Sequence, residues 1–447
     1  MALDFFWLED RTATTQRVSF RCTADHAAVG VSGNTVAVAT ATKDGTGYVD
    51  IAATADAGTA TLLVDGVPSG TINYPAFAAS TDTFTMGVAG CQSQDYEFLA
   101  GHWLKKDCSL VVQTGDWIYE GEAYNQWGET GMASCLVTPT AANWFKHHRQ
   151  PHRNPGWKVL GHSVPIYKIE DDHDVIDKYD QTDQAAMATA ITAYVAANGG
   201  TRADALTAIT GFAFGAIEAY RHQNPYYAFT FGAARIIVPN LMKYTDPLTK
   251  AAGPTKTKMG ATQLAWFLGE LADPSPIKVV ISSKVLFNGP NDDGWYPWPN
   301  DPVTYPGFTD ELSTILKHIK TNAIKGVIWM TGDSHHPMVQ NLTPQMVATK
   351  LGIGTAADYD HVVMFNATPS GKIQDHNVTA GPADGVIWKK QSDGVASGLH
   401  RDAVVAKLVI SPAECQAEMW TISGQRIGYG IIDAGSNQMR HGWFVDD

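Results

Sequence analysis

Short runs of alternating apolar and polar residues, separated by turns, fill the first 80 positions of the chain. The clearest run is 17–23, in which every second side chain is apolar, as in a strand with one buried face. Glycine-containing turns separate similar runs at 35–40, 48–52, 60–64 and 71–74. The pattern predicts a small β-sandwich domain over residues 1–80, immunoglobulin-like in type.

After residue 83 the pattern changes to short, continuous apolar runs that alternate with helical stretches. The expected central strands are 84–89, 110–113, 164–169, 278–282 and 327–330. The expected helices are 95–106, with Asp95 as N-cap, 182–198, 203–221, 262–272 and 309–322. Stretches 288–308 and 375–398 are rich in Gly, Pro, Asp and Asn, which favours long loops. This alternation predicts an α/β domain over residues 81–447.

Side chains that can bind a cation follow four of the expected strands. They are Cys91, Asp116, the acidic run 171–174, and the run 332–336 with Asp333 and two histidines. Because ligands collect beyond the carboxyl ends of strands in α/β sheets, these side chains can converge on one site. Neighbouring carboxylates repel one another unless a cation lies between them. The number of candidate ligands favours two metal ions that share a bridging carboxylate.

Composition and charge exclude several classes of protein. The chain has 447 residues, of which 44% are hydrophobic and 17% charged, so it is long and apolar enough to fold around sizeable cores. Its 32 basic and 45 acidic residues give a net charge of −13, and no nucleic-acid partner is expected. No apolar run approaches the roughly 18 residues that a membrane span needs. The oligomeric state does not follow from these properties.

Cysteine usage and the N-terminus bear on location. The five cysteines are an odd number, so at least one thiol lies outside any intramolecular disulfide. The first ten residues carry three acidic side chains and neither a basic patch nor a long apolar run, so no signal peptide is predicted. We expect either a cytoplasmic protein or an exported form whose leader is absent.

Five motifs together resemble the PhoD-like alkaline phosphatases, a branch of the metallophosphoesterases with a calcineurin-like double-sheet core flanked by helices. The motifs, in the order found in that family, are Met86–Gln92, Gln113–Glu120, Glu170–Asp174, Gly260–Leu268 and Met330–His335. They span most of residues 84–336, and the β-rich start of the chain also looks like the domain that precedes the catalytic domain there. The resemblance implies a small phosphoester substrate and alkaline phosphatase or phosphodiesterase activity.

The resemblance also implies a metal centre. In similar proteins an iron(III) ion is held by the residues that correspond to Cys91, Asp116, Tyr119 and His335. Asp116 would bridge to a second ion, typically calcium in the family, although other divalent metals are possible. Asp172 and Asp333 are the candidate ligands of this second ion. Asp177 is a rival to Asp172, because Asp177 or Lys178 stands where the family usually has Asn.

Two further positions are carried over from the family. Its acidic residue before an Asp-x-Trp loop corresponds best to Asp293, with Asp301 as the rival. His173 lies where related enzymes place a histidine that steadies the phosphate or protonates the leaving group. One departure is Glu170, which replaces the usual Trp.

The predicted function is metal-dependent hydrolysis of phosphate esters. A metal-bound hydroxide at a binuclear site, bridged by the catalytic Asp116, would attack phosphorus in line while both cations withdraw charge. Two alternatives stay open at this point. One is a binding or structural module that kept the fold and lost turnover, and the other is a metal-dependent amidase on a similar scaffold.

Overall fold

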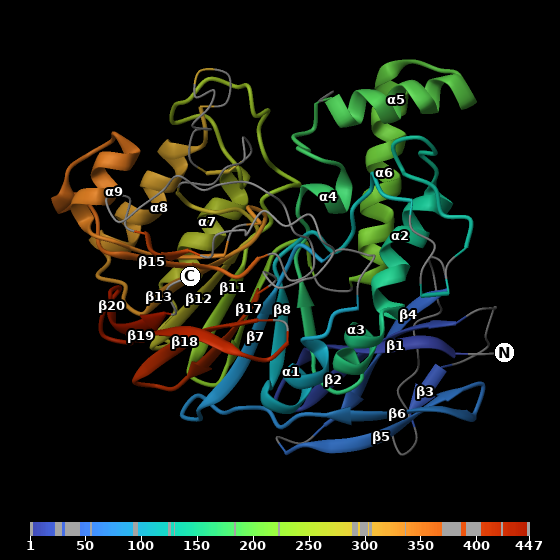
Figure 1. Ribbon diagram of the computed structural model, residues 1–447, viewed down its shortest axis with the longest axis horizontal. Coiled ribbons are helices and arrows are strands. Elements are labelled where there is room, and N and C mark those ends of the chain that lie inside the picture. Colours follow the sequence, from blue (N-terminus) through green and yellow to red (C-terminus); the bar gives the residue numbers. More distant parts are fainter. Residues whose placement is uncertain are drawn as a thin grey trace.

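The computed structural model describes residues 3–22, 29–31, 45–53, 56–92, 97–123, 127–128, 130–182, 185–221, 224–287, 294–295, 303, 306–335, 337–368, 386–389, 404–421 and 423–444. Within these ranges the chain forms two seven-stranded sheets and two three-stranded sheets (Figure 1). Both large sheets mix parallel and antiparallel pairs. The α/β class predicted from the sequence is therefore confirmed.

The N-terminal region consists of two small antiparallel sheets. One has the order β1-β2-β4 and the other β3-β5-β6. Their strands are β1 (Leu3–Arg11), β2 (Thr15–Cys22), β3 (Val29–Val31), β4 (Thr46–Ala52), β5 (Gly58–Val64) and β6 (Val67–Tyr74). Side chains of both sheets meet in one hydrophobic cluster, which includes Phe20 and Val49 from the first and Leu62 and Ile72 from the second.

Four of the five strands expected in this region are present, whereas 35–40 lies outside the described residues. Strand β1 was not predicted. The domain boundary at residue 80 and the immunoglobulin-like topology stay predictions.

Two large sheets form the centre of the molecule. The first has the order β20-β19-β18-β17-β7-β8-β9 and the second β10-β11-β12-β13-β15-β14-β16. The strands of the first are β7 (Phe84–Ala89), β8 (Leu110–Gln113), β9 (Ile166–Lys168), β17 (Val404–Ile410), β18 (Glu414–Thr421), β19 (Arg426–Asp433) and β20 (Met439–Phe444). The strands of the second are β10 (Tyr227–Phe231), β11 (Ala234–Val238), β12 (Ile277–Ser282), β13 (Val327–Thr331), β14 (Met338–Leu342), β15 (Val362–Asn366) and β16 (Val386–Lys389).

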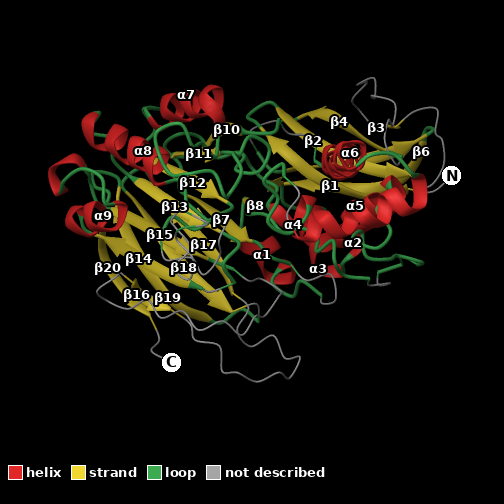
Figure 2. Cartoon of the chain, turned by 90° about the horizontal axis from the view of Figure 1, so that it is seen from above, coloured by secondary structure: helices red, strands yellow, loops and turns green. Residues whose placement is uncertain are grey.

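The two large sheets pack face to face, as Figure 2 shows from above. Their shared core includes Met86 and Val88 of β7 and Ile328 and Met330 of β13, all without exposed surface. Helices cover the outer faces, so every residue of β8 and β12 is buried. Burial on both faces explains why these strands read as continuous apolar runs. Strand β16 lies inside the expected loop 375–398, so that loop prediction is wrong over four residues.

Helices surround the double sheet. They are α1 (Gly101–Asp107), α2 (Ala141–Arg153), α3 (Pro155–Gly161), α4 (Asp172–Val175), α5 (Ala185–Asn198), α6 (Arg202–Tyr220), α7 (Gly260–Leu271), α8 (Thr309–Thr321), α9 (Pro344–Leu351) and a 3₁₀ turn, η1 (Ala356–Asp358). Helices α7, α8 and α9 lie outside the second large sheet, and α2, α5 and α6 lie towards the N-terminal sheets (Figures 1 and 2). In the described ranges no helix combines the length and apolar character that a membrane crossing requires.

The predicted helices are present, with one boundary corrected. Helix α1 begins at Gly101, so the expected start at Asp95 is too early, and Asp95 itself lies outside the described residues. Four described residues before Gly101 are not helical. Helices α2, α3, α4 and α9 were not predicted.

Strand β1 attaches the N-terminal sheets to the rest of the molecule. Its Phe5 and Trp7 pack with Ala219 and Tyr220 at the end of α6. The backbone N–H of Arg11 donates a hydrogen bond to the hydroxyl of Tyr167 in β9, at 2.9 Å. Strand β1 therefore contacts both the end of α6 and strand β9.

Candidate metal centre

The candidate ligands lie just beyond the carboxyl ends of strands from both large sheets. Cys91 follows β7, Asp116 follows β8, and Asp333 follows β13. Because β7, β8 and β9 are parallel neighbours, their ends meet at one edge. The loops are joined by backbone hydrogen bonds of 3.0 Å from Cys91 N–H to Gly115 C=O and from Gln92 N–H to Asp116 C=O. The convergence predicted from the sequence is present.

Four of these ligand positions have left-handed backbone. The φ angles are 52° at Cys91, 54° at Asp116, 66° at Asp333 and 51° at His335. This backbone conformation costs free energy for residues other than glycine. Such strain persists where the surroundings hold the backbone in place. Gly115, at φ 104°, supplies part of that constraint, because a Cβ atom there would lie 2.4 Å from the Cβ of Asp171. The candidate ligands thus sit on tight, fixed turns.

A first ligand group surrounds Asp116. Metal-binding atoms of Cys91, Asp116 and His335 all lie within 4.8 Å of one another, and all three residues are buried. The Tyr119 hydroxyl donates to Asp116 Oδ2 at 3.1 Å and lies 2.8 Å from His335 Nε2. Among the described residues, Asp116 Oδ1 has no hydrogen-bond partner although it is buried. A thiol, a carboxylate, a phenol and an imidazole around an unsatisfied oxygen fit a transition-metal ion.

Without a bound cation, the thiol and the phenol of this group stay protonated. Burial raises the pKa of the Cys91 thiol and of the Tyr119 phenol well above their usual values, and the Asp116 charge raises both further. Burial would also raise the pKa of Asp116, but the His173 charge and the nearby His335 outweigh it and lower that pKa. A metal ion held by Cys91 and Tyr119 would instead favour their ionised forms.

A second group, which we call the acidic quartet, consists of Asp116, Asp171, Asp172 and Asp333. Their carboxylate oxygens lie within 4.8 Å of one another, and all four residues are buried. The quartet already contains a positive charge, because the ammonium nitrogen of Lys284 lies within 3.0 Å of three of its members. The predicted ligands Asp172 and Asp333 are therefore brought together, but around a lysine.

Lys284 and Asp171 were not chosen as site residues from the sequence. A usable signal was present, since Lys284 comes two residues after the end of β12 and so obeys the strand-end rule that located the other residues. In the quartet burial would raise the pKa of Asp172, but Lys284 and His173 outweigh it and lower that pKa. For Asp171, burial prevails and the pKa is raised, although Lys284 opposes the change.

His173 lies between the ligand groups and solvent. Its Nδ1 is 2.8 Å from Glu120 Oε2, and its Nε2 is 3.7 Å from Asp177 Oδ1. The imidazole packs against the Tyr119 ring with a centroid distance of 4.5 Å. Burial would lower the pKa of His173, but Glu120 and Asp116 outweigh burial and raise it well above the usual value. The side chain is 21% exposed, against 1% for Asp116, so His173 forms the accessible side of the centre.

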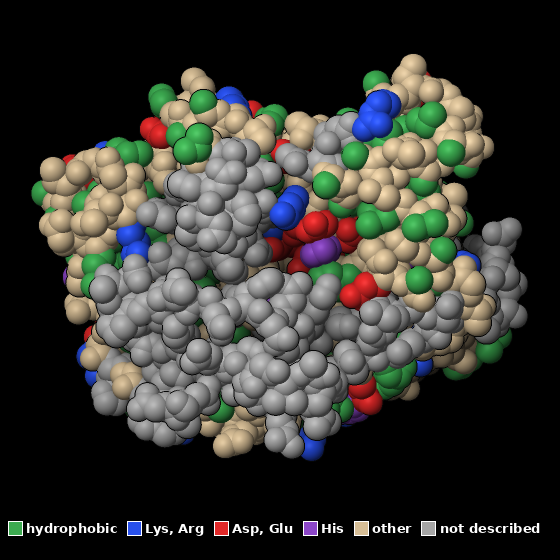
Figure 3. Space-filling view, turned by 45° about the horizontal axis from the view of Figure 1, so that its top comes forward, with side chains coloured by type: hydrophobic (Ala, Val, Ile, Leu, Met, Phe, Trp, Pro, Cys, Tyr) green, Lys and Arg blue, Asp and Glu red, His purple; other side chains and the backbone are tan. Residues whose placement is uncertain are grey.

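The space-filling view shows a hollow in which acidic side chains surround a histidine, with a basic side chain beside them (Figure 3). The rival ligand Asp177 belongs to a third possible group with Asp172 and His173. The predicted ligand Asp293 and its rival Asp301 lie outside the described residues, and their role stays a prediction.

Asp174 holds the loops of the centre together without joining the ligands. Its Oδ1 accepts hydrogen bonds from the backbone N–H groups of Trp117, at 2.9 Å, and Ile118, at 3.2 Å. Its Oδ2 accepts from the N–H of Asp171 at 2.9 Å. Burial and the nearby Asp116 raise the pKa of Asp174 to about 8. The carboxyl group thereby fixes the turn after β8 against the start of α4.

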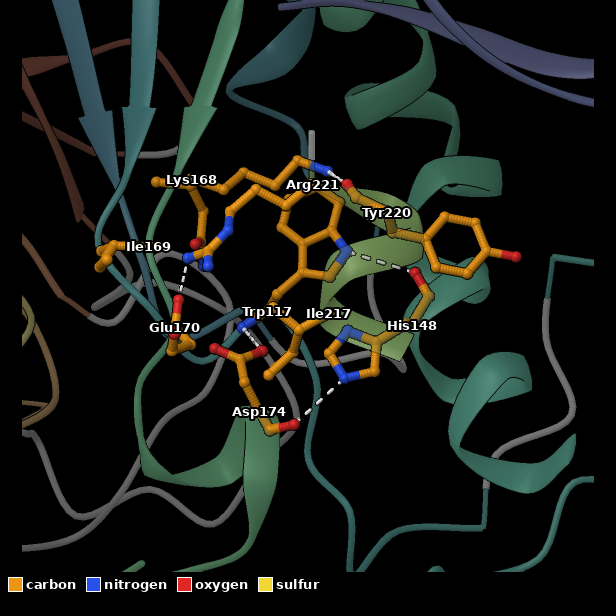
Figure 4. Close-up of a pocket in the computed structure, with 10 residues that line it drawn as sticks. Trp117, His148, Lys168, Ile169, Glu170, Asp174, Ile217, Tyr220 and Arg221 are labelled. Atoms are coloured by element: carbon orange, nitrogen blue, oxygen red, sulfur yellow. Dashed lines mark hydrogen bonds and ion pairs between the residues drawn. The ribbon is translucent and has the colours of Figure 1, made fainter. Parts of the chain in front are cut away.

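A small cavity of about 20 Å³ lies behind these loops (Figure 4). Its lining includes Trp117, His148, Lys168, Glu170, Asp174 and Arg221. This volume is enough for one water molecule and far too small for a phosphoester. Arg221 donates a short hydrogen bond to Glu170, the residue that replaces the Trp usual in the family. The cavity is therefore part of the support of the centre and not a substrate site.

The double β-sheet thus carries buried carboxylate, imidazole, thiol and phenol groups near its strand ends, an arrangement suited to holding a metal ion. Residues 86–369 match the family model of the PhoD-like phosphatases, which is more than half of the chain. The chain belongs to the PhoD-like phosphatase family, and the resemblance seen in the sequence is confirmed.

Relatives agree with this assignment. Alkaline phosphatase D of Bacillus subtilis (strain 168) is 23% identical over 301 residues, which cover 61% of this chain and 49% of that protein. The chain thus spans about half the length of this curated relative. A solved structure described as PhoD has a TM-score of 0.72 at 15% identity and covers 98% of this chain and 91% of its own.

A purple acid phosphatase, PPD1, from yellow lupin (Lupinus luteus) seeds has a TM-score of 0.57 at 12% identity. This match covers 97% of this chain and 74% of the lupin chain. At these identities both structural matches show the fold alone.

Proposed function

We propose that this protein hydrolyses small phosphate mono- or diesters at a metal centre formed by Cys91, Asp116, Tyr119 and His335. The observation that carries the proposal is the geometry around Asp116. Three other donor side chains surround its carboxylate, and its buried Oδ1 has no partner among the described residues. Membership of a phosphatase family supplies the reaction class.

The donor chemistry favours iron(III) at this centre. Carboxylate and phenolate oxygens are hard ligands, which suit a trivalent ion. A metal ion held by these residues would lower the pKa of coordinated water and withdraw charge from the phosphoryl oxygens. The chain fixes the ligands on the strained turns described above, so little rearrangement is needed when the ion binds.

His173 is the proposed proton donor to the leaving group. Glu120 accepts a hydrogen bond from Nδ1 and stabilises the charged imidazolium, which leaves Nε2 on the side of the more exposed Asp177. The distance of 3.7 Å from Nε2 to Asp177 is longer than a hydrogen bond, so Nε2 can donate to a substrate oxygen. A donor at this place is suited to protonate an alkoxide as the ester bond breaks.

The proposal is tested by metal quantification together with hydrolysis of p-nitrophenyl phosphate and bis-p-nitrophenyl phosphate. We expect the iron-loaded protein to hydrolyse at least one of them. Asp116→Asn should lower kcat/KM by at least about 10²-fold, since even second-shell changes at metal sites cost about 10- to 100-fold. The control is Asp433→Asn, the same change at a half-exposed residue of β19, which should keep wild-type activity.

Three outcomes would contradict the proposal. Normal turnover by Asp116→Asn would remove this residue from the mechanism. Hydrolysis of amides without phosphoesters would identify an amidase, and absence of metal and turnover after iron is supplied would identify a binding module. The iron assignment has its own check, because ferric phenolate absorbs visible light, and a colourless, iron-free, fully active protein would overturn it.

A further inference from the structure

The acidic quartet does not fit a second metal ion, because a side chain of the protein already lies where that ion would bind. We infer that the ammonium group of Lys284 is the fixed second cation of this centre, so the centre takes up one metal ion per chain. This inference rests on the proposed metal site at Cys91 and His335 for the first ion, and it replaces the predicted calcium by a residue.

The ammonium group of Lys284 contacts three carboxylates of the quartet. An ammonium group has three N–H donors and no acceptor. Its Nζ lies 3.0 Å from Asp171 Oδ1, 2.9 Å from Asp172 Oδ1 and 2.8 Å from Asp333 Oδ1. The contacts to Asp172 and Asp333 are charge-assisted hydrogen bonds, whereas the contact to Asp171 is an ion pair, since Asp171 Oδ1 has no hydrogen-bond partner among the described residues.

A metal ion and the lysine cannot share this place. Calcium binds oxygen at about 2.3–2.6 Å and requires six to eight ligands, among which these same carboxylate oxygens would have to be counted. A divalent ion near the ammonium group would also meet a like charge in a region with little water to screen it. The Lys284 side chain has no exposed surface, so the ammonium group is enclosed with its three partners.

The backbone around Lys284 is held firmly. The Ser282 hydroxyl donates to the carbonyl oxygen of Lys284 at 2.5 Å and accepts from Trp295 Nε1 at 3.4 Å. The carbonyl of Ser283 packs against Gly332, where a Cβ atom would lie 3.0 Å away. The loops after β12 and β13 are therefore in close contact, and they fix the lysine opposite Asp333.

The two positive charges are linked through Asp116. Its Oδ2 accepts from Tyr119 in the first group, and the same carboxylate belongs to the quartet around Lys284. The bridging position predicted for Asp116 is thus kept, with a lysine on one side. A positive charge carried by a side chain cannot be removed by a chelator.

The test counts metal ions in the full-length protein and does not use turnover. In wild-type protein, elemental analysis should find one transition-metal ion and no calcium per chain. Added calcium should leave Tm unchanged. In Lys284→Ala the carboxylates lose their cation, and we expect a gain from zero to one bound calcium per chain, with a calcium-dependent rise in Tm. Terbium luminescence provides a second readout of the same site.

Two variants make the test specific. Lys256→Ala removes another buried lysine, whose Nζ donates to the Leu248 carbonyl at 2.7 Å, and it should gain no calcium. Adding Asp333→Asn to Lys284→Ala should abolish the gained site. If the terbium signal survives that addition, the ion lies elsewhere and the inference is wrong.

Wild-type protein that binds calcium at a site lost in Asp333→Asn would overturn the inference, as would a folded Lys284→Ala protein that gains no ion. Should Lys284→Ala not fold, the wild-type metal count decides alone. Because no step uses a substrate, a wild-type protein with one metal ion and no phosphoesterase activity would refute the proposed function and still support this inference.

Discussion

His173 is the residue at this centre whose proposed chemical role leads to a selective kinetic test. A proton donor matters most when the leaving group is a strong base, as with an alkyl phosphate, and least for p-nitrophenolate. His173→Asn should therefore lower kcat for alkyl phosphates by about 10²- to 10⁴-fold and affect nitrophenyl phosphate much less. Steady-state kinetics on a series of leaving groups measures the difference.

The control for His173→Asn is His102→Asn, at an exposed histidine of α1. It should behave as wild type with every ester. Equal losses for good and poor leaving groups in His173→Asn would instead mean that the residue binds phosphate or positions its neighbours.

At the scale of elements, the turn between β8 and Trp117 depends on Gly115. Gly115→Ala adds a methyl group 2.4 Å from the Cβ of Asp171, at a φ of 104°. Because neither atom can move without shifting backbone, we expect a loss of about 1–3 kcal/mol in the free energy of unfolding. Activity and metal content should fall as well, since the turn carries Asp116. Chemical denaturation and metal analysis measure these effects.

Gly199, just after α5, provides the matched control. It also has positive φ, at 72°, but a Cβ there would meet nothing within 4 Å. Gly199→Ala should therefore cost only the backbone term of about 1 kcal/mol and leave metal content unchanged. If Gly115→Ala lowered the free energy of unfolding no more than Gly199→Ala does, the close approach of Gly115 to Asp171 would not limit stability.

At the scale of the whole molecule, buried neutral histidines should make the fold sensitive to acid. Burial lowers the pKa of His148 to about 3, and it lowers the pKa of His147 as well. An unfolded histidine takes up a proton near pH 6.5, so between about pH 6.5 and 3 the unfolded state binds more protons than the native state. Stability is therefore complete above this range and falls with pH by about 1.4 kcal/mol per unit for His148 alone.

His148→Gln removes this proton uptake while keeping a donor for the Asp174 carbonyl, which His148 Nε2 contacts at 3.1 Å. Urea denaturation at pH 7, 6, 5 and 4 should show a shallower pH dependence for this variant than for wild-type protein. The exposed residue His102 is again the control, as His102→Gln. The same pH dependence of the free energy of unfolding in all three proteins would contradict the buried, neutral state of His148.

The sequence predicted best those elements that the local pattern of apolar and polar residues determines. Strands 84–89 and 110–113 have the predicted bounds, because continuous apolar runs between turn residues have few alternatives. Helix α2 was missed because its buried face consists largely of polar side chains, among them His147, His148 and Gln150. Burial of that kind is decided by partners from distant segments, which a local window cannot contain.

The first ligand group was predictable because thiol, carboxylate and imidazole groups at strand ends have a recognised use. Three of the four quartet residues were predicted, whereas Asp171 and the lysine among them were not. A lysine side chain is not a usual metal ligand. The placement of Lys284 depends on the pairing of β12 with β13, and β13 begins 45 residues after β12 ends, at 327 against 282. Such a pairing is invisible until the sheet order is known.

The left-handed turns at Cys91 and His335 have a consequence for engineering. Glycine would relax the backbone at either position, so a library selected for heat resistance alone should drift towards glycine there. Such a variant would be more stable and would lack one of the proposed metal ligands. Stability and the proposed metal binding therefore make opposite demands on Cys91 and His335. A directed-evolution experiment should keep these two codons fixed.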